Sequence, residues 1–174
     1  MSELSESMPV EAVTTITTAT GSRDVDVSNL RPFIMVQAVE YHAGKFPRQY
    51  QRFSLWADTL TLLGDIVPDG SEAKVFYGQP HTLTSQASTL PATLEDLLAI
   101  GAEGFAFLEW ASFSVNRVNA GGADTARHFE AVGQARCDFF RKELARLGRR
   151  NRVRQSLLFV PEEETAGQSA VVGP

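Results

Sequence analysis

The stretch STLPATLEDLL, residues 88–98, divides the chain into two parts with different sequence patterns. Ser88 or Thr89 can cap a helix, and Pro91 suits the first helical turn. Two acidic residues follow where the positive end of a helix dipole would lie. Before this stretch apolar residues alternate or cluster, whereas after it they recur every three or four positions. The stretch therefore predicts a change from β-structure to α-helix.

Two helices are predicted after this boundary, packed as an antiparallel hairpin. The first should run to about Asn119, and the second should extend from Asp124 or Thr125 to Gly148. Four small residues lie inside the helical patterns: Gly101, Ala102, Gly104 and Gly133. Because glycine inside a helix costs about 1 kcal/mol relative to alanine, these positions predict a close approach to the partner helix or to another subunit.

The part of the chain before the boundary carries β signals. A Thr-rich run over residues 13–20 is expected to form an edge strand. Further strands are expected over residues 33–41, 48–56, 59–62 and 73–77. The sequence Pro68-Asp69-Gly70 predicts a tight turn before the last of them. These four or five short strands predict a small antiparallel β-meander, either a sandwich or a partial barrel, and hence an α+β fold.

The two ends of the chain differ from its body. Residues 1–12 are rich in Ser and Glu and are predicted to be a flexible acidic arm. The segments predicted to follow are a β-rich domain over 13–86, a helical hairpin over 87–148, and a basic stretch with an extended C-terminal tail over 149–174. Within the tail, the apolar sequence SLLFV at residues 156–160 resembles a strand without a local partner, so we expect it to be added to the sheet of another chain.

The composition excludes several classes of protein. An apolar fraction of 43% and a net charge of -5 argue against a disordered chain and against a general nucleic-acid coat. The single Cys137 has no partner for a disulfide or a CxxC site, and the three histidines lack metal-ligand spacing. No cofactor, metal or catalytic residue is therefore predicted. The chain shows neither a signal peptide nor an apolar run that could span a membrane, so a soluble cytoplasmic protein is expected.

The basic stretch over residues 141–154 is the strongest anomaly in the composition. It holds seven Lys and Arg against one Glu, so seven minus one gives a net charge of +6. Docking onto an acidic protein surface and binding of nucleic-acid phosphates both fit this pattern. The alternative is a solvated helix face whose cations lie near the negative, C-terminal end of the helix dipole. It explains only those cations of the basic stretch that precede the predicted end of the helix.

Four aromatic residues lie on several sides of the first predicted helix: Phe105, Phe107, Trp110 and Phe113. This pattern is typical of a helix buried on more than one side. A two-layer body of this size covers one side, so the second apolar side predicts oligomerisation. The alternative is that the β-rich domain covers it.

Taken together, these segments resemble the head–tail connector, or adaptor, proteins of tailed bacteriophages. The resemblance covers roughly residues 33–160 and is carried by these sequences: VFYGQPHTL at 75–83, STLP at 88–91, LEDLLAIGA at 94–102, FRKELARL at 140–147 and RRNRVR at 149–154. This chain begins almost directly with β-like sequence, whereas many adaptors carry helices there. The resemblance thus leaves open whether the neck position is that of an adaptor, a stopper or another tail-completion protein.

The resemblance implies a structural protein of the virion, assembled in the bacterial cytoplasm. Its partners would be the portal protein, the tail-completion proteins and about eleven further copies of itself in a ring through which genomic DNA passes. The residues expected to contact these partners are Phe107, Trp110, Arg146, Arg149, Arg150, Arg152, Arg154, Leu157, Leu158, Phe159 and Val160. A nucleic-acid-binding module that uses the basic stretch is the alternative from another class.

Overall fold

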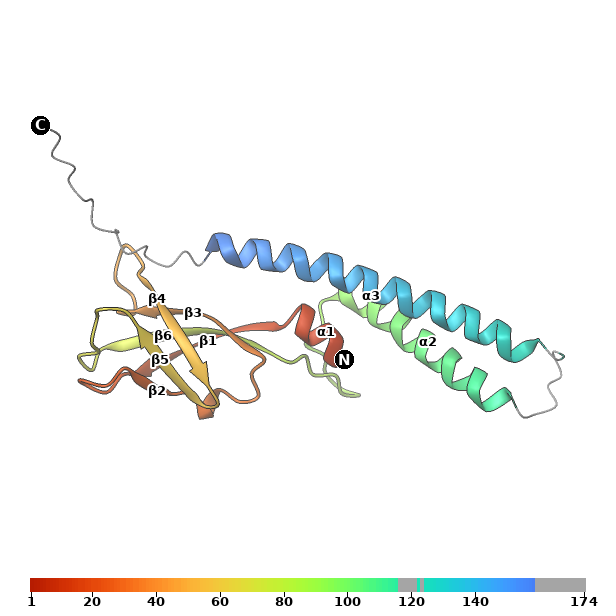
Figure 1. Ribbon diagram of the computed structural model, residues 1–174, viewed down its shortest axis with the longest axis horizontal. Coiled ribbons are helices and arrows are strands. Elements are labelled where there is room, and N and C mark those ends of the chain that lie inside the picture. Colours follow the sequence, from red (N-terminus) through yellow and green to blue (C-terminus); the bar gives the residue numbers. More distant parts are fainter. Residues whose placement is uncertain (116–121, 123, 159–174) are drawn as a thin grey trace, which may run out of the picture. The chain divides into compact units, whose positions relative to one another are not determined.

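The computed structural model describes residues 1–115, 122 and 124–158, and it confirms the α+β fold class (Figure 1). The chain folds as two compact units. Unit 1 comprises Met1–Val10 and Pro80–Val153, and unit 2 comprises Glu11–Gln79 with the described residues from Arg154 on. Unit 1 holds the helices, and unit 2 is built on a sheet.

The sheet of unit 2 is antiparallel, has six strands and is curled into a half-barrel. Its strands follow the spatial order β1-β6-β3-β4-β5-β2, and a short 3-10 helix, η1 (Ser28–Leu30), follows β2. The strands are β1 (Val10–Thr17), β2 (Asp24–Asp26), β3 (Met35–Tyr41), β4 (Tyr50–Trp56), β5 (Thr59–Leu63) and β6 (Glu72–Gln79).

The predicted strands are present, and the Thr-rich strand β1 lies at a sheet edge as expected. Strands β3, β4 and β5 form a meander, but β6 then returns across the sheet to pair with β3. The free side of β5 is taken by β2, which the sequence did not predict. Strand β2 was missed because it pairs over only three residues, too few for an alternating pattern.

The core of unit 2 consists of apolar side chains to which all six strands contribute, with the buried ones on β2, β3, β5 and β6. Its fully buried members include Val39 and Tyr41 of β3, Leu60 of β5 and Val75 of β6. Alternation places these residues on one side of their strands. Side chains on one side of the curled sheet therefore form the core of unit 2.

Asp69 fixes the turn between β5 and β6. Its Oδ1 accepts hydrogen bonds from the Tyr41 hydroxyl at 2.8 Å and from the Ser71 backbone N–H at 2.9 Å, while its own N–H donates to the Tyr41 oxygen at 2.9 Å. The hydrogen bonds from Ser71 and Tyr41 hold the pKa of Asp69 well below its usual range, with His42 adding a smaller electrostatic effect. These hydrogen bonds thus connect the Pro68-Asp69-Gly70 turn to Tyr41 at the end of the central strand β3.

Replacing Asp69 with asparagine should remove a pH-dependent part of the stability of unit 2. Because the folded-state pKa of Asp69 is lower than the unfolded value of about 3.9, its contribution is present above about pH 4 and is lost as the pH falls further. The difference in unfolding free energy between wild type and Asp69→Asn should therefore shrink between pH 6 and pH 2 in urea titrations. Asp65→Asn, at an exposed position nearby, is the matched control, and an equal pH dependence in both variants would contradict this assignment.

Unit 1 consists of a short helix α1 (Ser2–Ser7) and two long helices, α2 (Ala92–Ser114) and α3 (Thr125–Leu158), which lie side by side (Figure 1). Helix α2 begins at Ala92, close to the predicted boundary, but its N-cap is Pro91 and neither Ser88 nor Thr89 caps it. The predicted continuation of this helix over residues 116–119 lies outside the described residues. A cluster of Leu90, Leu94, Leu97, Phe140 and Leu144 forms the core of this unit.

The prediction of a flexible arm over residues 1–12 is wrong. Residues 2–7 form α1, whose Leu4 is fully buried in the core of unit 1, and β1 begins at Val10. His81 ties this end down, since its backbone N–H donates to Ser5 Oγ at 3.0 Å and its Nε2 lies 2.7 Å from the Met8 carbonyl oxygen. One buried leucine among Ser and Glu residues is too weak a signal to predict from sequence.

The prediction that the second helix ends at Gly148 is also wrong. Helix α3 continues for ten residues beyond it, through the basic stretch to Leu158. Gly148 stays helical because the arginines that follow are good helix formers. It lies against α1, where an added Cβ would be 3.5 Å from Ser7. The strand predicted over 156–160 is therefore wrong for residues 156–158, which are helical, and its last two residues lie outside the described part of the chain.

The close approach predicted from the small residues is confirmed for the three glycines, all of which face the partner helix. A Cβ at Gly101 would lie 2.8 Å from the Phe140 ring, and one at Gly104 would lie 2.9 Å from Cys137 Sγ. At Gly133 it would lie 2.9 Å from the carbonyl oxygen of Gly104. These contacts run in opposite directions along the two helices, so α2 and α3 are antiparallel as predicted.

Candidate interaction surface

Helix α2 is apolar on the side that faces away from α3. Its buried residues, among them Leu94, Leu97, Gly101 and Gly104, occupy one side of the helix. The opposite side carries a stripe of exposed apolar residues over four turns, with Glu103 on one flank and the exposed Glu109 on the other. We call this surface the outer face of α2; it consists of Ala99, Ala102, Ala106, Trp110 and Phe113.

The two aromatic residues of the outer face belong to an aromatic cluster. Trp110 lies 5.4 Å from Phe113 and 6.4 Å from Phe129 of α3, and Phe129 stacks on Phe107 at 5.8 Å between ring centroids. The structure thus brings together the predicted contact residues Phe107 and Trp110. Phe107 packs between the helices, whereas Trp110 remains 53% and Phe113 49% exposed.

In the described part of unit 1, the second side of α2 stays partly exposed. Covering the exposed half of one aromatic side chain would remove about 100 Å² from water, which is worth about 2.5 kcal/mol. A surface of this kind on a protein is typical of a site that contacts another molecule. An apolar second side, as the sequence indicated, is therefore present on α2 and partly exposed.

A hollow of about 420 Å³ lies beside the outer face, between α1 and α2. Its apolar lining includes Leu98, Ala102 and Phe105 of α2 together with Leu83 from the preceding loop. The Phe105 ring is also approached by the guanidinium of Arg141, at 5.9 Å from the ring centroid. The surface around the outer face therefore has room for a protruding side chain.

The basic stretch forms an exposed helical surface on the C-terminal half of α3. Three of its cations are engaged within the chain: Arg141 with Glu3 at 3.7 Å, Arg146 with Glu143 at 2.8 Å, and Arg154 with Glu11, a residue that also belongs to unit 2. Arg149, Arg150 and Arg152 are exposed, and no carboxylate in the described part of the chain pairs with them. Together with Lys142, which is also exposed and has no carboxylate partner among the described residues, they are the cations best placed to bind a partner.

The structure describes only the first part of the apolar segment that follows the basic stretch. Leu157 and Leu158 form the last residues of α3. Phe159 and Val160 lie outside the described residues.

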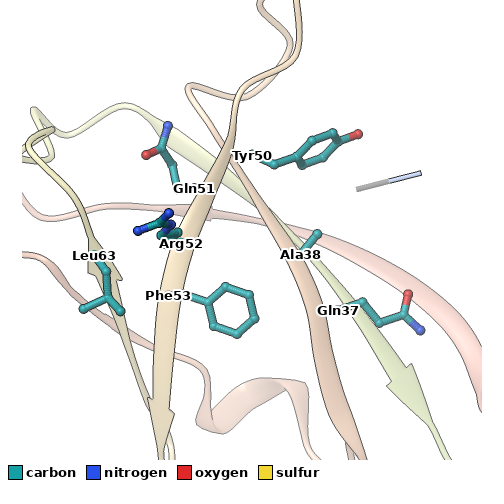
Figure 2. A pocket seen from close by; sticks show the side chains of 7 residues that line it. All are labelled: Gln37, Ala38, Tyr50, Gln51, Arg52, Phe53 and Leu63. Carbon is teal, nitrogen blue, oxygen red and sulfur yellow. The ribbon is translucent and has the colours of Figure 1, made fainter. Parts of the chain in front are cut away.

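Unit 2 contains a pocket where β3 and β4 part. These strands pair only at Val39 with Gln51 and at Glu40 with Tyr50. Beyond these pairs a pocket of about 320 Å³ opens, as Figure 2 shows. Its lining residues are Gln37, Ala38, Tyr50, Gln51, Arg52, Phe53 and Leu63. Arg52 is the one charged group among them, and the Gln37 amide nitrogen is buried without a hydrogen-bond partner. This lining holds no nucleophile with a neighbouring base.

Sequence reasoning missed the alanines of the outer face. It had identified the large aromatic residues, but exposed alanines are good helix formers and give no separate signal. The spacing of Ala99, Ala102 and Ala106 by three and four residues could have placed them on one stripe with Phe113. Their importance follows only from knowing which side of α2 packs on α3.

Among the described residues, no group of three His, Cys, Asp or Glu side chains is arranged to hold a metal ion. None of the described helices combines the length and the apolar character that crossing a membrane requires. Comparisons with known proteins found no matching family model, curated protein or solved structure.

Proposed function

We propose that the protein is a structural subunit of the head–tail connector of a tailed bacteriophage. In this role it assembles on the portal protein as a ring, binds tail-completion proteins and lets genomic DNA pass through the ring. The outer face of α2 is the observation that carries the proposal, because a subunit of an assembly needs an apolar surface that its own fold leaves open. The sequence resemblance described above supplies the identity of the assembly.

The rigid attachment of the outer face supports this role. The glycines allow α2 to pack closely against α3, so the exposed aromatic residues lie on a helix that is held in place by its partner. A preorganised surface loses little conformational entropy when it binds. The basic surface on α3 provides a second, charged contact for an acidic patch on the portal or on a neighbouring subunit.

The proposal is tested with the portal protein encoded in the same phage genome. The chain should co-sediment with portal particles, and native mass measurement should show several copies per particle. Trp110→Ala with Phe113→Ala should leave the fold intact, since both side chains are half exposed, and should abolish the addition of copies. A wild-type chain that never joins portal particles would overturn the connector role.

The exposed arginines of α3 support a second candidate, a nucleic-acid-binding module. If Arg149, Arg150 and Arg152 neutralise three phosphates, log affinity should fall against log salt with a slope of about -2.7. The connector proposal predicts that the wild type shows no such salt-dependent duplex binding. It also predicts that the double variant Arg149→Glu with Arg150→Glu docks more weakly onto the portal. Duplex binding with that slope, lost in the charge-reversed variant, would favour the module over the connector.

A further inference from the structure

We infer that the free protein pairs with a second copy of itself through the outer face of α2, with the two α2 helices antiparallel. This builds on the proposed use of the outer face as a contact between copies. It does not depend on the phage role, because the geometry would apply to a chain of any function. The occupant of the outer face in the free protein is thus the same face of another copy.

The sizes of the side chains along the outer face determine the direction of pairing. The N-terminal half of the face holds only alanines, and the C-terminal half holds Trp110 and Phe113. In a parallel pair, aromatic residues would meet aromatic residues and alanines would meet alanines, which leaves a wedge-shaped gap. In an antiparallel pair each large side chain meets small ones, and the faces fit along their length.

One register makes this fit symmetric. With Ala106 on the two-fold axis, Trp110 lies four residues to one side and Ala102 four residues to the other, so they face each other across the pair. Phe113 and Ala99 are likewise seven residues from Ala106 on opposite sides. The Trp110 ring then enters a hole formed by Ala99, Ala102 and Ala106 of the second copy, as knobs enter holes in coiled coils.

The surroundings of the face fit this arrangement. The hollow beside Ala102 gives the Phe113 ring of the second copy space next to Leu98. Glu103 lies at the rim of the hole that receives Trp110, and its carboxylate is already paired with Arg136 at 2.9 Å. Pairing in this register therefore covers no uncompensated charge on that side of the hole.

The size of the contact predicts a weak dimer. Four half-exposed aromatic side chains contribute about 100 Å² each, or about 400 Å² together, and the six alanines add less than this, so the contact stays below the usual 1,200–2,000 Å² of stable interfaces. A closed ring needs head-to-tail contacts, so a two-fold pair cannot be the ring contact and must open before a ring forms. The dimer is thus a resting form that keeps the outer face out of water.

Disulfide trapping in the full-length protein tests both the pairing and its register. Ala106→Cys should form a cross-linked dimer on mild oxidation, since residue 106 meets its own copy. Ala99→Cys should not, because an antiparallel pair separates it from its copy by fourteen residues of helix, about 21 Å, against the 4.4–6.8 Å usual between disulfide-linked Cα atoms. The wild type is the control, because Cys137 is only 1% exposed.

Each outcome decides the matter. Cross-linking of Ala106→Cys alone supports the antiparallel pair, cross-linking of both variants indicates a parallel pair, and cross-linking of neither overturns the two-fold contact. Light scattering of the uncross-linked wild type should show a concentration-dependent dimer, and Trp110→Ala should raise its dissociation constant roughly tenfold or more. A wild type that stays monomeric overturns the inference. It does not affect the connector proposal, which is tested separately by portal binding.

Discussion

Replacing Gly133 with valine should separate the two long helices of unit 1. A Cβ at Gly133 would lie 2.9 Å from the Gly104 carbonyl oxygen and 3.0 Å from the Leu108 backbone nitrogen. These are backbone atoms of α2, which cannot rotate away as a flexible side chain can. Overpacking typically costs 1–3 kcal/mol, and because valine also adds two methyl groups, we expect a loss of about 3 kcal/mol or more in the free energy of unfolding.

Urea denaturation followed by circular dichroism at 222 nm measures this loss, since the long helices dominate the signal. Gly148→Ala is the matched control in the same helix, because its Cβ would lie 3.5 Å from Ser7, an ordinary contact. This variant should gain about 0.5–1 kcal/mol from the higher helix propensity of alanine. If Gly133→Val proved as stable as the wild type, the close packing of α2 on α3 would be refuted.

Replacing Phe140 with alanine should have a comparable effect through the opposite defect, a cavity. Phe140 is 3% exposed and packs with Leu94, Leu97 and Leu144 in the core of unit 1. Removal of a buried phenylalanine side chain typically costs 3–5 kcal/mol. We expect a loss in this range in the same urea experiment, with the sheet of unit 2 left folded.

A double-mutant cycle shows whether Gly101 and Phe140 are coupled as the structure indicates. Gly101→Ala alone should destabilise the protein, because its Cβ would lie 2.8–3.0 Å from three atoms of the Phe140 ring. In the Phe140→Ala background the ring is absent, so the same substitution should be neutral or stabilising. The coupling energy should be about 1–3 kcal/mol, and additive effects would show that the two residues do not meet.

The helix pair is the part of the fold that sequence alone predicted best. Pro91 and the acidic residues after it marked where α2 begins, and the glycine positions predicted the close packing, because these signals are local or follow one helical period. The order of the strands was beyond prediction, since the return of β6 to pair with β3 depends on contacts between residues far apart in sequence. The same limit explains why α1 was missed, because its single anchor Leu4 gains its meaning from residues beyond position 90.

The candidate surface was predicted in part. Phe107 and Trp110 were identified and do meet in one aromatic cluster, but the sequence could not tell the covered side of α2 from the open one. The basic stretch was identified as well, yet its continuation of α3 was not, because Gly148 resembles a helix stop unless the α1 contact is known. In both cases the missing information was which neighbour packs against the helix.

The glycine contacts between α2 and α3 also separate two kinds of selection. In a randomised library screened only for folding, positions 101, 104 and 133 should return to glycine, because a larger residue there meets the other helix. Residues 110 and 113 should drift freely in that screen, since their side chains are half exposed. A second screen for assembly would instead restore the aromatic residues, so sequence variation alone could show which side of this helix serves the fold and which serves its partners.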